Sequence, residues 1–294
     1  MNSIESTLED KNILVTGGCG FIGSEVTKQL SEHGANITVI DNLSSGKEEY
    51  IQKIPRVELI KSDLSQISSF KSILEEMDYV INLAALPFIP DSYYMPMKFF
   101  EFNVNSTIAL ALEVVKQKNI KKFIHISSSE IYGSAKYIPM DENHPTLPQS
   151  TYAVSKLAAD RVVFTMYKEH GLPAVIIRPF NSFGPNITQP YIIPEIISQM
   201  LKNNKKISLG NVNTKRDLTY VSDTAKGIIS SLTAEGIVGE TINVGSQRSV
   251  SIKELVNMIS EILEKDVEIE IDASRMRPFD VETLVCNYDR ANRL

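Results

Sequence analysis

A tyrosine and a lysine four residues apart, Tyr152 and Lys156, are the residues whose types and spacing most directly suggest chemistry. Thr151 to His170 is expected to form a helix, and positions i and i+4 of a helix share one face. An ammonium close to a phenol favours the phenolate, so the pKa of the phenol is expected to fall from roughly 10 toward neutral. Ser128, which follows an apolar run, could hydrogen-bond the same substrate oxygen. Such a trio can take a proton from a sugar or alcohol hydroxyl while a hydride leaves the carbon, although the same spacing also occurs in ordinary surface pairs.

A glycine-rich segment, Gly17 to Gly23, indicates where the hydride acceptor would bind. It follows the apolar run at residues 12–16 and opens a helix-like segment at residues 22–33. The pattern G-x-x-G-x-x-G permits a tight turn and lets backbone N–H groups and a helix N-terminus approach a pyrophosphate. Asp41 ends the next apolar run, 18 residues after Gly23, where an acid would hydrogen-bond an adenosine ribose. The order of these pieces predicts dinucleotide binding, whereas a glycine run alone would indicate only a turn.

Asp41 also bears on which dinucleotide is bound. Its carboxylate would repel a 2′-phosphate, and no Arg or Lys follows it until Lys47, so NAD is favoured over NADP. Asp63, after the third apolar run, is either an adenine contact or the first turn of a helix. The predicted cofactor contacts in this part of the chain are Gly17, Gly20, Phe21, Ile22, Gly23, Asp41, Asn42, Asp63 and Leu64.

The first half of the chain alternates strand-like and helix-like segments. Apolar runs lie at residues 12–16, 37–40, 57–61, 79–84, 122–126 and 174–177, and helical periodicity marks residues 22–33, 102–118 and 151–170. This alternation predicts an α/β fold in which right-handed βαβ units build a Rossmann doubly wound parallel sheet. We expect an NAD-binding domain over residues 1–180, with returning segments near 216–245. Residues 181–294 are expected to form a smaller, interleaved α/β substrate domain.

Composition and charge narrow the class of protein. The 294 residues are 43% hydrophobic and 22% charged, which is typical of a soluble globular enzyme. A net charge of −6 argues against a nucleic-acid partner, and no apolar run approaches the ~20 residues that cross a bilayer. The N-terminal residues, Met1 to Asp10, are polar and acidic, unlike a signal peptide. The isolated cysteines, Cys19 and Cys286, indicate a reducing compartment, so we expect a cytoplasmic location. We also expect no membrane partner and no metal site.

With these pieces in order, the chain resembles the extended short-chain dehydrogenase/reductase family, specifically its nucleotide-sugar epimerase/dehydratase branch. The resemblance covers nearly the whole chain. Besides the glycine loop, it rests on Asn82-Leu83-Ala84-Ala85, Asn103-Val104-Asn105, Ser127-Ser128-Ser129-Glu130-Ile131-Tyr132-Gly133, Tyr152-x-x-x-Lys156, Arg178-Pro179-Phe180-Asn181, Arg216-Asp217 and Arg277-Pro278-Phe279-Asp280. It implies NAD as cofactor, a nucleotide-diphosphate sugar as substrate, and a homodimer formed through the helices around 102–118 and 151–170.

The resemblance also implies a role for each matching residue. Tyr152 would be the base for the sugar 4-hydroxyl, Lys156 would tune its pKa and bind the nicotinamide ribose, and Ser128 would hydrogen-bond the hydroxyl. Arginine suits a diphosphate because its planar fork of donors matches the oxygens. The remaining cofactor contacts would be Leu83, Ala84, Ala85, Asn103 and Pro179, and the substrate contacts would be Ser129, Asn181, Arg216 and Arg277.

The step after C4 oxidation would decide the reaction. A 4,6-dehydratase needs a further acid/base carboxylate, worth typically 10²–10⁴-fold, whereas a 4-epimerase rotates the ketone and needs none. Glu130 lies two residues beyond Ser128, on the same side of the chain if the backbone stays extended, where dehydratases of this branch carry a glutamate. The sequence therefore predicts an NAD-dependent nucleotide-sugar 4,6-dehydratase with Glu130 as acid/base.

Several alternatives remain open at this stage. Familiar hexose dehydratases have an aspartate where this chain has Ser129, which leaves the proton donor for the C6 hydroxyl undefined. The Ser-Ser-Glu version is similar to dehydratases of the legionaminic-acid pathway, which act on N-acetylated sugars, and also to uronate decarboxylases. A UDP-glucose 4-epimerase-like enzyme is the first alternative and a decarboxylase the second. A non-catalytic NAD-sensing protein is the alternative outside enzymes, but it would have no reason to keep Ser128, Tyr152 and Lys156 together.

Overall fold

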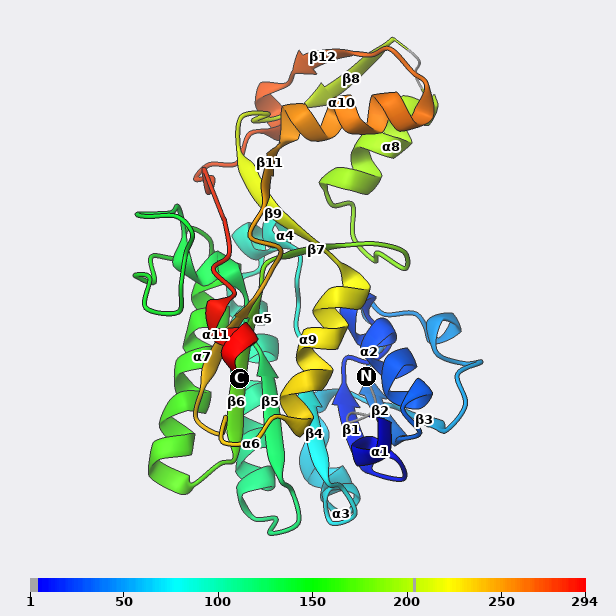
Figure 1. Cartoon of the computed structure of the whole chain (residues 1–294), viewed down its shortest axis with the longest axis vertical. Coiled ribbons are helices and arrows are strands. Elements are labelled where there is room, and N and C mark those ends of the chain that lie inside the picture. Colours follow the sequence, from blue (N-terminus) through cyan, green and yellow to red (C-terminus); the bar gives the residue numbers. More distant parts are fainter. Residues whose placement is uncertain (1–4, 203–204) are drawn as a thin grey trace.

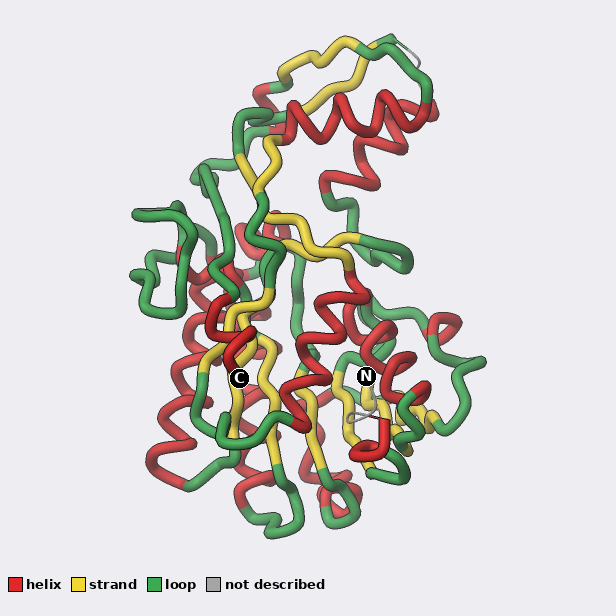
Figure 2. The backbone as a smooth tube through the Cα atoms, in the orientation of Figure 1, coloured by secondary structure: helices red, strands yellow, loops and turns green. Residues whose placement is uncertain are grey.

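A sheet of parallel strands is the base of the fold (Figures 1 and 2). The computed structural model describes residues 5–202 and 205–294. Within them, seven strands lie in the order β10-β6-β5-β4-β1-β2-β3, and every neighbouring pair is parallel. The strands are β1 (Asn12–Thr16), β2 (Asn36–Asp41), β3 (Val57–Lys61), β4 (Tyr79–Asn82), β5 (Lys122–Ile126), β6 (Ala174–Pro179) and β10 (Thr241–Val244). The order reverses between β1 and β4, which is the switch point of a doubly wound sheet, and the predicted Rossmann fold is confirmed.

Helices cover both faces of this sheet, so its central strands have no solvent-exposed side. Ile124 and Ile177 pack with α2 (Phe21–Glu32) and α9 (Val221–Thr233). The preceding residues, Phe123 and Ile176, point the other way and pack with α6 (Ser106–Val115) and α7 (Thr151–His170). Every residue of β4, β5 and β6 is buried. Strands buried on both faces have continuous apolar runs, which explains why the sequence pattern located them.

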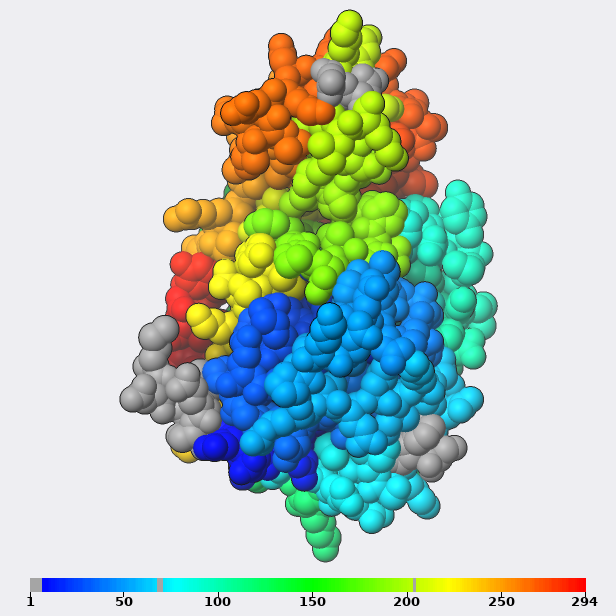
Figure 3. All heavy atoms as spheres, turned by 90° about the vertical axis from the view of Figure 1, so that its right-hand side faces the viewer, coloured from blue at the N-terminus to red at the C-terminus, as the bar shows by residue number. Residues whose placement is uncertain are grey.

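A smaller lobe lies at the carboxyl ends of the strands, at the top of Figure 1. It contains a sheet of β7 (Asn181–Phe183), β9 (Lys215–Tyr220) and β11 (Ser249–Ser251), and a parallel pair, β8 (Lys206–Leu209) with β12 (Glu268–Ile271). Two helices, α8 (Ile192–Lys202) and α10 (Ile252–Leu263), pack on this pair around a core of their own. Figure 3 shows the lime and orange segments of this lobe stacked on the blue N-terminal part of the chain.

The chain passes between the two lobes more than once. After β9, helix α9 and strand β10 return to the large sheet, where β10 pairs with β6. The structure differs from the predicted division in two places. Strand β9 pairs with β7 and β11 rather than joining the large sheet, and Val281, Leu284 and Cys286 pack with Ile131 and Tyr132 of the large lobe, before α11 (Asp289–Arg293).

The helix expected over residues 102–118 has a different form. Helix α5 (Pro96–Phe100) leads through a π-helical turn, η3 (Glu101–Asn105), into α6, which ends at Val115. The buried Asn103 amide in this turn accepts a hydrogen bond from the Leu86 backbone at 2.8 Å and donates to Ser155 Oγ at 2.9 Å. Such turns often place a functional side chain. Elements too short for periodicity to predict are α1 (Glu5–Leu8), α3 (Lys71–Leu74), α4 (Ile89–Tyr94), η1 (Glu48–Tyr50), η2 (Leu64–Phe70), η4 (Ser129–Tyr132) and η5 (Ala273–Arg275).

A buried ion pair joins the elements that carry the predicted reaction centre. Arg178, on β6, donates from Nε and Nη2 to the two carboxylate oxygens of Asp160, on α7, at 2.9 and 3.1 Å. Its Nη1 donates to the Tyr132 hydroxyl, on η4, at 2.8 Å. Burial raises the pKa of Asp160, but hydrogen bonds and charge from Arg178 outweigh it and lower that pKa to about 2. The pair therefore fixes α7, η4 and β6 relative to one another.

Replacing Asp160 by asparagine should lower the free energy of unfolding by about 3–5 kcal/mol at pH 7, because it leaves a buried guanidinium uncompensated. The wild-type contribution should be present above pH ~4 and be lost as the pH falls through about 2, the folded-state pKa. Urea unfolding followed by circular dichroism measures both effects. Asp10→Asn, which weakens the exposed Arg56–Asp10 pair at 2.7 Å, should cost at most about 1 kcal/mol. Equal losses in the two variants would contradict this assignment.

Candidate active site

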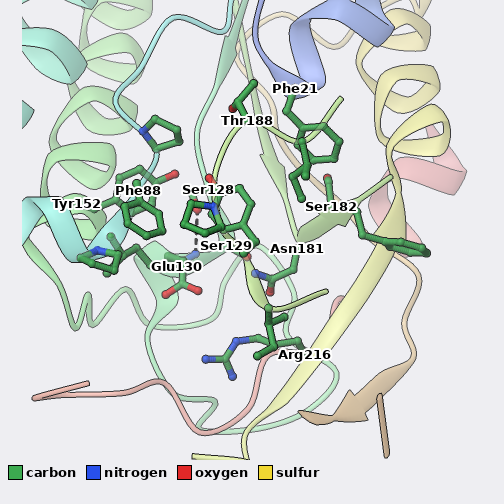
Figure 4. Close-up of a pocket in the computed structure, with 18 of the residues that line it drawn as sticks. Phe21, Phe88, Ser128, Ser129, Glu130, Tyr152, Asn181, Ser182, Thr188 and Arg216 are labelled. Atoms are coloured by element: carbon green, nitrogen blue, oxygen red, sulfur yellow. Dashed lines mark hydrogen bonds between the residues drawn. The ribbon is translucent and has the colours of Figure 1, made fainter. Parts of the chain in front are cut away.

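The two lobes enclose a cleft at the carboxyl ends of the strands, which is where open parallel sheets bind ligands. Its volume is about 730 Å³, and its wall runs from the glycine loop after β1 to small-lobe residues beside α8 and η5. Figure 4 shows Tyr152 at one side of the pocket, Ser128 and Glu130 in the middle, and Asn181 and Arg216 toward the other side. The cleft therefore brings together residues that lie far apart in the sequence.

Most of the predicted site residues line this cleft. They are Gly17, Gly20, Phe21, Ile22, Gly23, Asp41, Leu83, Ala85, Ser128, Ser129, Glu130, Tyr152, Lys156, Pro179, Asn181, Arg216 and Arg277. Three more, Asn42, Leu64 and Ala84, line a pocket of about 50 Å³ that shares Gly17, Asp41 and Ala85 with the cleft. This placement is the arrangement that the sequence pattern predicts, and their contacts with ligands stay predictions.

The glycine loop is shaped by close packing of its own backbone. A Cβ added at Gly23 would lie 2.1 Å from the Gly17 carbonyl oxygen, and one at Gly17 would lie 2.8 Å from the Ala84 nitrogen. Gly17 also has φ +71°, a conformation that residues with side chains rarely adopt. The absence of side chains leaves the loop backbone and the N-terminus of α2 open to a pyrophosphate, so the loop fits a dinucleotide.

Asp41 holds this loop in place and also lines the cleft. One carboxylate oxygen accepts a hydrogen bond from the Cys19 backbone at 2.9 Å, and the other accepts from the Leu43 backbone at 2.8 Å. Each oxygen can accept a second bond, so these contacts leave capacity for a ribose hydroxyl. The pKa of the Cys19 thiol is raised to about 12, by burial first and then by the Asp41 charge, so Cys19 is an inert packing residue.

Two predicted cofactor contacts, Asp63 and Asn103, line neither pocket. Asp63 caps η2, where one oxygen accepts from the Ser65 backbone at 2.8 Å, and its other oxygen accepts from the Asn42 amide at 2.9 Å. Asp63 therefore lies at the start of a helical turn, which is the second of the two roles that the sequence left open for it. Asn103 is 1% exposed and bonds to the backbone of Leu86, so it positions the loop that carries Leu83 to Ala85. Direct contact of either residue with a cofactor stays a prediction.

Tyr152 and Lys156 lie on the same helix, α7, but the lysine does not act on the phenol as expected. Lys156 Nζ donates to the Ile126 carbonyl oxygen, at the end of β5, at 2.5 Å. Burial raises the pKa of Tyr152 to about 12, while hydrogen bonding with Ser128 opposes the rise and the Glu130 charge adds to it. The predicted fall toward neutral is therefore wrong for the chain alone, because desolvation outweighs every stabilising contact. Burial also lowers the pKa of Lys156 to about 8.

The segment that carries Ser128 and Glu130 turns instead of staying extended. Ser128 itself is extended, with φ −160° and ψ 148°, and caps the helical turn η4 by accepting a hydrogen bond from the Glu130 backbone at 3.2 Å. This contact leaves the Ser128 hydroxyl proton free for donation. The expectation of an extended backbone is wrong, yet Ser128, Ser129 and Glu130 all line the cleft, with Glu130 only 7% exposed.

The two predicted diphosphate ligands come from different segments and share one carboxylate. Arg216 Nη2 lies 3.3 Å from Asp280 Oδ1, and Arg277 Nη1 lies 3.5 Å from the same oxygen. Burial lowers the pKa of Arg216, whereas the charges of Glu130 and Asp280 raise it, so the candidate acid/base acts electrostatically on this arginine. The sequence prediction quoted Asp280 as the end of a motif but gave it no role. Its place three residues after Arg277 was a usable sign of an ion pair.

An aromatic contact across the cleft was also missed. Phe88, on the loop after β4, and Tyr191, just before α8, have ring centroids 6.2 Å apart at 62°. Both line the cleft. Burial raises the pKa of Tyr191, and the charge of Tyr152 adds to the rise. No spacing rule predicts a contact between segments about a hundred residues apart on different lobes.

Three polar atoms in the cleft wall have no hydrogen-bond partner among the described residues: Tyr93 Oη, Ser127 Oγ and Asn181 Oδ1. Buried polar groups in folded proteins are nearly always paired, so unpaired ones in a cleft mark where a ligand would contact the wall. In residues 5–202 and 205–294, no group of three or more His, Cys, Asp or Glu could hold a metal ion, and no helix is long and apolar enough to cross a membrane.

Known proteins share this architecture. The family described as GDP-mannose 4,6 dehydratase matches residues 14–294. A putative UDP-glucose 4-epimerase of Methanocaldococcus jannaschii is 32% identical over 252 residues, which cover 84% of this chain and 81% of that protein. The solved UDP-N-acetylglucosamine 4-epimerase of Methanobrevibacter ruminantium is 34% identical with a TM-score of 0.88, over 97% and 91% of the two chains. The dTDP-glucose 4,6-dehydratase DesIV of Streptomyces venezuelae, solved with NAD, is 26% identical with a TM-score of 0.87, over 96% of this chain and 90% of that chain.

Fold, cleft and relatives agree on the class: an enzyme that works with a bound dinucleotide. The chain belongs to the extended short-chain dehydrogenase/reductase family, in its branch of NAD-dependent nucleotide-sugar epimerases and dehydratases. Epimerases and a dehydratase stand at similar structural distance from it, so overall similarity does not separate the two reactions.

Replacing Lys156 by methionine should stabilise the ligand-free protein. The pKa of Lys156 falls from 10.5 to about 8 through burial, so below pH 8 its buried charge costs on the order of 3 kcal/mol. Urea unfolding at pH 7 should show a gain of that order, reduced by the lost hydrogen bond to Ile126. The gain should shrink as the pH rises from 8 toward 10.5, because the folded wild-type lysine then loses its proton.

The matched control is Lys28→Met, since the Lys28 side chain is 54% exposed. This variant should change the free energy of unfolding by less than about 0.5 kcal/mol at both pH 7 and pH 10. A Lys156→Met effect that is the same at pH 7 and pH 10 would show that desolvation of the ammonium is not its cause.

Proposed function

We propose that this chain is an NAD-dependent nucleotide-sugar 4,6-dehydratase, which oxidises sugar C4, eliminates water across C5 and C6 and reduces C6. The observation that supports this choice is Glu130, whose carboxylate lies in the cleft wall, largely shielded from solvent, beside Ser128. Elimination requires a group that takes the C5 proton, and a carboxylate at this place is suited to do so. A 4-epimerase has no step that uses such a group.

When bound, NAD would supply the hydride acceptor for the oxidation of C4 and the hydride donor for the reduction of C6. Gly17, Gly20, Gly23 and the N-terminus of α2 would hold its pyrophosphate, because the glycine loop lines the cleft and opens this helix. Asp41 would bind the adenosine ribose, and Lys156 the nicotinamide ribose. Asp41 favours NAD over NADP, since its carboxylate would lie against a 2′-phosphate.

The chain's own groups then divide the proton transfers. Tyr152 takes the proton of the sugar 4-hydroxyl, and Ser128 donates a hydrogen bond to the same oxygen. Tyr152 is the second residue of α7, where the positive end of the helix dipole favours the phenolate and offsets part of its desolvation. Glu130 takes the C5 proton and later returns it. Arg216 and Arg277 would hold the diphosphate of the nucleotide sugar.

Product analysis tests this proposal. The protein is incubated with UDP-GlcNAc, UDP-glucose, GDP-GlcNAc and UDP-glucuronate, and the nucleotide sugars are separated and weighed by mass spectrometry. Loss of water supports the dehydratase, and loss of carbon dioxide would indicate a uronate decarboxylase instead. An isomeric product of unchanged mass would indicate a 4-epimerase, the second candidate, which is favoured by the 34% identity to a UDP-N-acetylglucosamine 4-epimerase over 97% of the chain.

Replacing Glu130 by glutamine should separate the two half-reactions. Water loss should fall by about 10²–10⁴-fold, because the amide cannot take the C5 proton. C4 oxidation should persist, and the 4-keto sugar can be trapped with borodeuteride and detected by mass. Glu32→Gln, on the exposed end of α2, should leave both steps unchanged. Full dehydratase turnover in the Glu130 variant would refute its role.

We also propose that α6 and α7 pair with a second copy of the chain. Leu112 on α6 is 46% exposed and Val154 on α7 is 40% exposed, so each of these two contacting helices has an exposed apolar side chain. Sedimentation velocity at micromolar concentration should show a dimer, and Leu112→Arg should convert it to a monomer. Ile262→Arg, at a 77% exposed position of the small lobe, should leave the dimer intact. A monomeric wild type would contradict this proposal. The cytoplasmic location stays a prediction from the sequence.

A further inference from the structure

Tyr93 lines the cleft and carries a buried hydroxyl that no contact among the described residues satisfies. It lies on α4, a short helix that follows β4, and lines the cleft. Its Oη is shielded from solvent and has no hydrogen-bond partner among the residues that the structure describes. The next residue, Tyr94, is 85% exposed on the same short helix. Both tyrosines line the cleft, but only Tyr93 has a buried hydroxyl without a partner.

The charged groups that affect the pKa of Tyr93 are Arg277, Asp280 and Glu130, which all line the cleft. Burial raises the pKa of Tyr93, the positive charge of Arg277 opposes the rise, and the negative charges of Asp280 and Glu130 add to it. Arg277 and Asp280 already interact with each other at 3.5 Å. The phenol is thus an unpaired donor on a residue that lines the same cleft as the candidate acid/base Glu130.

The proposed dehydration needs a donor of this kind. Glu130 takes the proton from C5 and must keep it, because it returns a proton to C5 when C6 is reduced. The C6–O bond breaks with its electron pair on oxygen, so a separate acid has to protonate the departing hydroxyl. Ser129, next to Glu130, carries only an aliphatic hydroxyl, which is a much weaker acid than a phenol. Tyr93 offers such an acid, because it is a cleft-lining phenol whose hydroxyl no contact among the described residues uses.

We propose that Tyr93 donates its proton to the C6 hydroxyl as that group leaves, and so acts as a second catalytic acid beside Glu130. This inference rests on the proposed 4,6-dehydratase function. The oxygen departs as water with the Tyr93 proton, the two electrons removed at C4 return to C6 as hydride, and Glu130 returns a proton to C5. Tyr93 regains a proton from solvent and Tyr152 releases to solvent the one it took from the 4-hydroxyl, so protons and electrons balance.

Tyr93→Phe tests the proposal, because it removes one oxygen that has no partner and should leave the fold intact. Its melting temperature should be equal to or above that of the wild type. Water loss should fall by about 10²-fold, the lower end of the range for a general acid, and borodeuteride should trap the accumulated 4-keto sugar. Affinity for UDP, measured calorimetrically, should stay within twofold. Tyr220→Phe, the matched control at a 44% exposed position outside the cleft lining, should behave as the wild type in every assay.

Other outcomes would overturn the role of Tyr93. Water loss within twofold of the wild-type rate would remove it from the reaction. A tenfold weaker UDP affinity with no accumulated keto sugar would make Tyr93 a diphosphate ligand instead, and equal losses of C4 oxidation and water loss would make it a positioning residue. A wild type that releases no dehydrated product from any nucleotide sugar would refute the proposed function itself, which separates that failure from a failure of the Tyr93 assignment.

Discussion

The reaction centre depends on one buried ion pair, Arg178 with Asp160. Its members lie on β6 and α7, and the third partner, the Tyr132 hydroxyl, lies on the turn that carries Glu130. Breaking a buried pair by removing one partner leaves an uncompensated charge, so the contact does not open without a large cost. The helix of Tyr152, the turn of Glu130 and the strand leading to the substrate lobe are consequently held in one geometry, which preorganised catalysis requires.

Burial that holds the groups in place also opposes their charged forms. It raises the pKa of Tyr152 to about 12 and lowers that of Lys156 to about 8. Both shifts therefore disfavour the charged forms, the phenolate and the ammonium, that oxidation of a hydroxyl uses. Added positive charge and hydrogen-bond partners reverse such shifts. The unpaired hydroxyl of Ser127 and amide oxygen of Asn181 indicate where partners are wanted. The cleft thus has the chemistry of a site that is activated by its own ligands.

One scaffold serves two reactions in this family, and the difference rests on a few side chains. The sheet, the glycine loop and the Tyr152–Lys156 pair are equally useful to an epimerase and to a dehydratase, since both begin by oxidising C4. Only elimination uses a base at C5 and an acid at the C6 oxygen. Glu130 and Tyr93 both line the cleft, and our proposals assign these two tasks to them, because Ser129 carries no acid of comparable strength.

The sequence by itself determined the Rossmann sheet, the glycine loop and the Tyr152–Lys156 helix, because doubly buried strands and short-range spacings leave local patterns. The tertiary structure alone decided which groups meet across long separations, such as Arg216 with Asp280, 64 residues away. It also decided that the phenol of Tyr152 is less acidic than expected. Desolvation depends on everything that packs around a group, so no local pattern predicts it. For the same reason the unpaired hydroxyl of Tyr93 became visible only once the chain had folded around it.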